Sequence, residues 1–114
     1  MKEKKDMKET IEKYQKMSKK ERLEAVEKRH ESILKQIKAL RCGAKIESFT
    51  YFKNELYQQP YHYVFEICIT GADKKFASAF RQVAKENKCP IKKIQGKNMY
   101  VIFTSKIAEY KHKN

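Results

Sequence analysis

The sequence predicts an α+β fold in the order α-β-β-α-β-β, with a four-stranded antiparallel sheet covered by helices on one face. Three observations predict it: a helical apolar stripe over residues 23–40, strict alternation over residues 61–70, and a second helical pattern over residues 73–88 that precedes a hairpin. The length of 114 residues is typical of one domain. We therefore expect a charged helical extension over residues 1–17, one α+β domain over residues 18–106 and a basic tail over residues 107–114.

The first helix of the domain is predicted by apolar residues that recur every three or four positions up to Leu40. Ser18 and Glu21 form a capping-box pattern in front of it, and Gly43 is expected to terminate it in a left-handed conformation. The stripe either packs on the sheet or forms a homodimer through residues 23–40. The partner-binding candidates for the dimer are Leu23, Val26, Ile33 and Ile37. His30, in the same stripe, is expected to be a hydrogen-bonded core or interface residue.

The strands are predicted by β-branched and aromatic residues over residues 45–53 and by the alternation over residues 61–70. A second hairpin follows across the turn Gly96-Lys97-Asn98. The helix before that hairpin is expected to be capped by Asp73 and ended by Pro90. The residues expected to face the helices are Phe65, Ile67, Met99, Val101 and Phe103. The residues expected on the open face are His62, Val64, Cys68, Tyr100 and Ile102.

The charge of the chain is strongly positive and unevenly distributed. The formal net charge is +13 and the isoelectric point is about 9.7. Residues 74–113 hold eleven lysine or arginine residues against only Glu86 and Glu109, whereas acids largely balance the bases of residues 1–31. A protein of this charge attracts polyanions, foremost nucleic acids. Because only four of the 27 cationic residues are arginine, backbone contact is expected to outweigh base reading.

The helix over residues 73–88 separates its apolar and basic side chains. At 100° per residue its cations form one stripe opposite Phe80 and Val83, and the following hairpin adds more lysines. The candidate phosphate contacts are Lys74, Arg81, Lys85, Lys88, Lys92, Lys93 and Lys97. Tyr100, together with Tyr61 or Tyr63, is the candidate for stacking on unpaired bases. The alternative interpretation is a merely solvated lysine-rich face.

No motif for catalysis or cofactor binding is present. The three cysteines, Cys42, Cys68 and Cys89, are too widely spaced to predict a zinc site or a disulfide framework. There is no glycine-rich phosphate loop, so we expect no cofactor, no metal and no enzymatic activity. A small ribonuclease built from His62, Glu66 and a lysine is a weaker alternative.

The sequence therefore predicts a non-enzymatic, cytoplasmic, basic nucleic-acid-binding protein that contacts DNA or RNA through phosphates. The rival hypothesis is a small inhibitor or adaptor, of the type that phages or plasmids encode, which binds a nucleic-acid-handling enzyme or ribonucleoprotein. An exposed apolar sheet face would favour this protein-binding alternative. The N-terminus lacks the apolar segment of a signal peptide, and no membrane span is expected.

Overall fold

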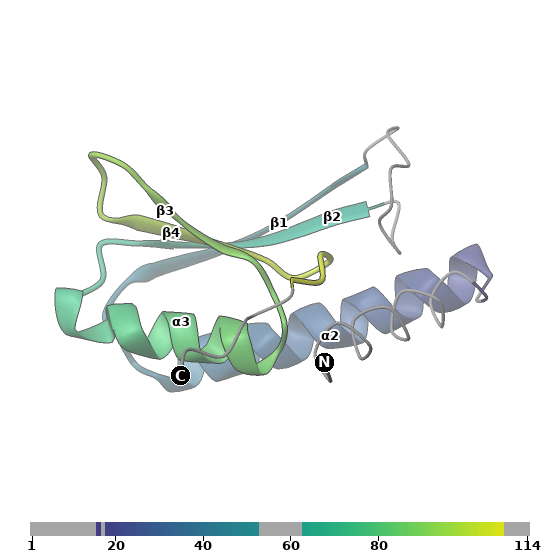
Figure 1. Cartoon of the computed structure of the whole chain (residues 1–114), viewed down its shortest axis with the longest axis horizontal. Helices are drawn as coiled ribbons and strands as arrows, with labels where there is room; N and C mark the ends of the chain where they lie inside the picture. The colour runs from purple at the N-terminus through teal and green to yellow at the C-terminus, as the bar shows by residue number, and fades with distance from the viewer. Residues whose placement is uncertain (1–15, 17, 53–62, 109–114) are drawn as a thin grey trace, which may run out of the picture.

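The fold is the predicted α+β arrangement, a four-stranded antiparallel sheet with two helices on one face (Figure 1). The computed structural model describes residue 16, residues 18–52 and residues 63–108. The elements in chain order are α2 (Lys19–Ala39), β1 (Lys45–Phe52), β2 (Tyr63–Thr70), the 3-10 turn η1 (Lys74–Phe76), α3 (Ala77–Glu86), β3 (Ile91–Ile94) and β4 (Met99–Phe103). The expected charged helical extension over residues 1–17, apart from residue 16, and the connection after β1 lie outside the described residues.

Helix α2 begins as the sequence indicates and ends differently. The Ser18 hydroxyl accepts a hydrogen bond from the Glu21 amide at 3.2 Å, and the Glu21 carboxylate accepts one from the Ser18 amide at 3.3 Å, so the capping box is confirmed. At the other end Leu40 is the C-cap, and Arg41 is the first left-handed residue, with φ of 49°. Gly43 is also left-handed, with φ of 71°, but it lies in the turn beyond the helix rather than at its cap.

The sheet has the strand order β1-β2-β4-β3, so β1 and β3 form its edges. In the β2–β4 pair Ile67 lies opposite Ile102 and Ile69 lies opposite Tyr100. Directly opposed residues share a face, so Tyr100 and Ile102 point towards the helices along with Ile67. The expected facing of β4 was therefore wrong, because its sequence is apolar on both faces and only pairing with β2 decides the register. The β4 residues on the open face are Met99, Val101 and Phe103.

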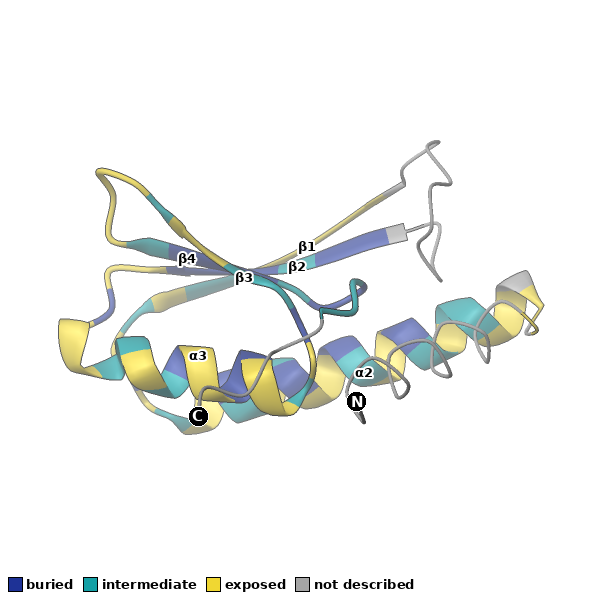
Figure 2. Ribbon diagram, in the orientation of Figure 1, coloured by how far each residue is buried: buried dark blue, intermediate teal, exposed yellow. Residues whose placement is uncertain are grey.

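The core lies between the sheet and the two helices. Ile33 and Ile37 of α2, Ile67 of β2 and Phe80 of α3 are fully buried there, and Figure 2 shows the buried sides of both helices turned towards the sheet. A smaller cluster joins Val26, Phe65 and the half-buried Leu23. These α2 residues are thus engaged within the fold, in agreement with the alternative in which the stripe packs on the sheet. A dimer through the same side chains would require them to leave this core.

Buried polar side chains of α2 tie the chain after β4 to the domain. His30 Nδ1 lies 2.6 Å from the Thr104 hydroxyl, and His30 Nε2 lies 2.6 Å from the Ser48 hydroxyl. Arg29 donates to the carbonyl oxygens of Thr104 at 2.8 Å and Lys106 at 3.1 Å. His30 is 3% exposed, which confirms the expectation of a hydrogen-bonded core histidine. These bonds hold the segment that follows β4 against α2.

The environment of His30 predicts acid sensitivity. Burial lowers the pKa of His30 from 6.5, and the charge of Glu31 opposes this shift more weakly. The unfolded chain therefore binds the proton more readily than the folded one. The contribution of the neutral His30 to the free energy of unfolding is complete above pH 6.5, and it is lost as the pH falls below that value. Urea unfolding between about pH 7.5 and about pH 5.5 should show this loss.

The His30→Gln variant is the control for this pH dependence. Glutamine has no proton to bind in that range, so its free energy of unfolding should vary less with pH than that of the unaltered protein. An identical slope in both proteins would contradict the assignment to His30.

Candidate nucleic-acid interface

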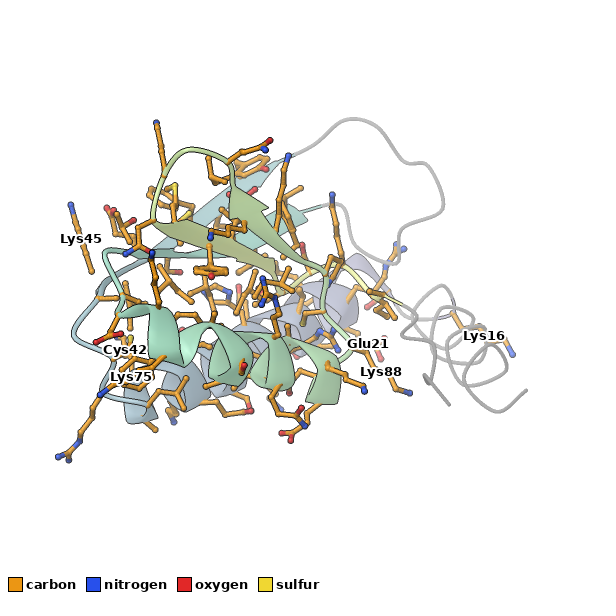
Figure 3. The ribbon with its side chains drawn as sticks, turned by 60° about the vertical axis from the view of Figure 1, so that its left-hand side comes forward. Lys16, Glu21, Cys42, Lys45, Lys75 and Lys88 are labelled. Atoms are coloured by element: carbon orange, nitrogen blue, oxygen red, sulfur yellow. The ribbon has the colours of Figure 1, made fainter. Side chains whose placement is uncertain are left out.

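The seven predicted phosphate contacts are all exposed, but they do not share one face of the sheet: Lys93 pairs with Tyr100 on the helix face, and Lys92 pairs with Val101 on the opposite face. They extend from η1 along α3 and across β3 to the hairpin turn, and we call them the basic face: Lys74, Arg81, Lys85, Lys88, Lys92, Lys93 and Lys97. Figure 3 shows α3 with the β3–β4 hairpin beside it and with Lys75 and Lys88 near its two ends. Lys75, which the sequence prediction did not include, is exposed and adds to this surface.

No carboxylate neutralises the basic face within residues 18–52 and 63–108. The ion pair found in this part of the chain joins Lys45 to Glu47 at 3.6 Å, on β1 at the other edge of the sheet. Glu86, the acid on α3, accepts a hydrogen bond from Gln82 at 2.8 Å. Uncompensated cations on a solvated surface sum to a positive potential that concentrates polyanions.

Arg81 and Lys93 meet at the ring of Tyr100. The Arg81 guanidinium carbon lies 6.0 Å from the ring centroid, and the Lys93 ammonium lies 5.9 Å from it. Phe80 packs against the same ring at 5.4 Å, with the planes inclined at 58°. Cations are attracted to aromatic faces at such distances, so this ring attracts one cation from α3 and one from β3.

Tyr100 therefore has a different position from the one expected. Its side chain is only 6% exposed and lies on the helix face, so the expectation of an open-face ring that stacks on bases was wrong. The Tyr100 ring instead lies beneath the basic face, where it contacts Arg81 and Lys93. Tyr61, the other stacking candidate, lies outside the described residues, as does the side chain of Tyr63.

The end of α3 fixes the position of Lys88. The Cys89 amide donates to the Ala84 carbonyl at 2.8 Å and the Lys88 amide to the Lys85 carbonyl at 3.1 Å, which is the Schellman arrangement. Lys88 occupies its left-handed position, with φ of 54°, where glycine is favoured. Its carbonyl accepts from Ala108 at 2.8 Å and from Arg29 at 3.1 Å. A lysine is thus held in a strained backbone conformation at the edge of the basic face.

The opposite sheet face carries two carboxylates, Glu47 and Glu66, among mostly apolar side chains. Glu66 accepts a hydrogen bond from the Tyr51 hydroxyl at 2.5 Å, which raises the pKa of Tyr51 to about 12. Phe49 lies beside this pair, and the Lys106 ammonium lies 4.7 Å from the centroid of the Phe103 ring. The sequence prediction did not single out Phe49 and Tyr51, although the alternation of β1 places them on one face.

The described residues assemble no metal-binding cluster. No cluster of three histidine, cysteine or acidic residues within residues 18–52 and 63–108 could hold a metal ion. Of the ribonuclease candidates, His62 lies outside the described residues and Glu66 is bound to Tyr51. The three cysteines are buried, and no disulfide joins any two of them. None of the helices in these ranges has the length and apolar content needed to span a bilayer.

Comparison of the chain with protein-family models, with curated proteins and with solved structures finds no match. The chain is thus an α+β domain with exposed cations along η1, α3 and the β3–β4 hairpin, and with Phe49 and Tyr51 exposed on the open face of its sheet.

Proposed function

We propose that this protein is a non-enzymatic nucleic-acid-binding protein whose basic face contacts the phosphate backbone of DNA or RNA. The observation that carries the proposal is the lack of a carboxylate partner for any of its seven cations within the described residues. Surface cations of a domain without such a ligand are commonly interspersed with acids. Six of the seven are lysines, which bind phosphate as point charges and read bases poorly.

Two details of the geometry support the same proposal. Arg81 and Lys93 both lie at the Tyr100 ring, so a phosphate bound beside this ring would meet one cation from α3 and one from β3. Lys88 occupies a position where glycine would cost less, and strain of this kind is often retained at functional sites. The protein would be cytoplasmic in this role, where nucleic acids are accessible and its three thiols stay reduced.

A protein-binding inhibitor or adaptor of a nucleic-acid-handling enzyme is the second candidate. The exposed Phe49 and Tyr51 on the open sheet face favour it, because exposed aromatic side chains beside polar groups are typical of protein interfaces. Such an interface would bind with little dependence on salt, which distinguishes it from phosphate contact.

Fluorescence anisotropy with labelled single- and double-stranded DNA and RNA, titrated against salt, tests the proposal. We expect the logarithm of the binding constant to fall with the logarithm of the salt concentration with a slope of about −4 to −7. The double variant Lys85→Glu with Lys88→Glu should weaken binding more than tenfold and make the slope shallower by about two.

Two control variants make this experiment selective. The variant Lys35→Glu with Lys38→Glu changes the net charge equally on the exposed side of α2, and it should weaken binding much less. Lys88→Gly removes one cation while it relieves the left-handed strain, so affinity should fall without a loss of stability. Equal effects of both double variants, or no binding at low salt, would contradict the proposal.

A further inference from the structure

The two edges of the sheet differ in how they are protected. Strand β3 has four residues, two of which are Lys92 and Lys93, and short lysine-bearing edges resist pairing with other strands. Strand β1 has eight residues, with its two charged side chains, Lys45 and Glu47, near its start. Within residues 18–52 and 63–108 no strand pairs with the outer side of β1. Its free edge therefore offers backbone groups for strand addition.

Side chains beside this free edge are also unusually exposed. Phe49 and Tyr51 are 44% and 43% exposed, and they are the exposed large hydrophobic residues of the described chain. Both lie on the open face, opposite Glu66 and Val64 of β2. Ser48 and Thr50 lie on the helix face of the same strand and are exposed as well. A partner strand at this edge would cover side chains on both faces.

We propose that the partner strand is β1 of a second copy of this chain, paired antiparallel with Phe49 opposite Phe49. In this register Glu47 lies opposite Tyr51 of the second copy, and Ser48 lies opposite Thr50 of the second copy. This register places an aromatic pair at the centre and a hydroxyl pair on each side of it, which are stabilising cross-strand combinations. No like charges face each other among these five residues. Strand β1 is thus complementary to the antiparallel β1 strand of a second copy.

Geometry and charge exclude two of the neighbouring registers. A two-fold axis perpendicular to the sheet keeps the helices of both copies on the same face. Each residue of one β1 strand is then paired with a residue whose side chain lies on the same face of the joint sheet. A register centred on Ser48 satisfies this condition but places Glu47 opposite Phe49. A register centred on Glu47 places two carboxylates opposite each other. The register centred on Phe49 avoids both arrangements. A register centred on Thr50 also avoids them, but it places neither Phe49 nor Tyr51 opposite its own counterpart, so cross-linking distinguishes the two registers.

The positive charge of the chain does not oppose this dimer. The basic face lies on α3 and β3, and β2 and β4 separate β3 from the β1 edge. The two basic faces would lie at opposite ends of a continuous eight-stranded sheet, many times further apart than the screening length of about 8 Å at physiological salt. If the proposed function holds, the dimer would present two phosphate-binding faces to one nucleic acid, and avidity would follow.

Cysteine cross-linking without nucleic acid tests the register directly. The variant Phe49→Cys places two thiols opposite each other, where the α-carbons of paired residues lie about 4.5–5.5 Å apart, within the range of a disulfide. In Tyr51→Cys the two thiols are four residues apart along the strands, about 13 Å. With diamide as oxidant, covalent dimer should form in Phe49→Cys and not in Tyr51→Cys. The native cysteines are buried in both variants.

The mass of the protein in solution provides the second measurement. Sedimentation at about 1–100 µM should show a dimer whose population rises with concentration. Phe49→Lys should make the protein monomeric while it stays folded, because the new lysine lies opposite Glu66 in its own sheet. Ser78→Lys adds the same charge on α3 and should stay dimeric. A monomer at every concentration, a dimer that persists in Phe49→Lys, or equal cross-linking of both cysteine variants would overturn the proposal.

Discussion

Replacing Phe80 with alanine is expected to lower the free energy of unfolding by about 3–5 kcal/mol, the range for a fully buried phenylalanine. Its ring is 0% exposed, with its centroid 6.4 Å from that of Phe76 and 5.4 Å from that of Tyr100. The variant loses the transfer free energy of the ring and leaves a cavity between α3 and the sheet. Since small domains are stable by only about 5–15 kcal/mol, a large fraction of the folded protein's stability depends on this residue.

Urea denaturation followed by circular dichroism measures this loss. Gln82→Ala is the control, because Gln82 lies exposed on the same helix and its replacement should change stability by less than about 0.5 kcal/mol. A loss for Phe80→Ala no greater than that of the control would show that α3 does not pack on the sheet through this ring. The variant should also weaken nucleic-acid binding, because Tyr100 would lose the packing partner that holds it beneath Arg81 and Lys93.

Arg29→Lys is expected to lower the free energy of unfolding by about 2–4 kcal/mol although the charge is kept. The guanidinium donates to three backbone carbonyls, those of Thr104, Lys88 and Lys106, and to the Cys89 sulfur. A lysine ammonium cannot reach four acceptors spread across two segments of chain. The segment after β4 and the turn after α3 would therefore separate from α2.

Arg22→Lys is a matched control for Arg29→Lys. Arg22 lies on the same helix and is half-buried, but its buried Nε has no hydrogen-bond partner among the described residues. Its replacement should cost less than about 0.5 kcal/mol. Hydrogen exchange at the Ala108 amide, which donates to Lys88, should accelerate in Arg29→Lys and stay unchanged in Arg22→Lys. Equal losses of stability in the two variants would contradict the role assigned to Arg29.

Local patterns in the sequence were sufficient for much of the fold. The capping box at Ser18 and the alternation over residues 63–70 depend on neighbours within a few positions, so both could be read directly and both are confirmed. The exposure of the basic face also follows locally, because a helix that buries Phe80 and Val83 turns Arg81 and Lys85 to solvent. Binding of nucleic acid by that face stays a prediction.

Other features depend on residues far apart in the sequence. Arg29 and His30 meet Thr104 across more than seventy positions, and no local signal marks that contact. The facing of Tyr100 was misjudged because β4 is apolar on both faces, so only its register against β2 decides which side is buried. The free edge of β1 likewise exists only once the strand order is known.

Propensity, capping and periodicity act over a few residues, so the amino-acid order alone indicates where helices and strands form and which side chains of each helix are polar. The buried face of β4, the carbonyls that Arg29 binds and the strand at the edge follow only from the folded chain. These outcomes depend on strand pairing and packing between distant segments, whose free energies do not appear in any short stretch of the chain.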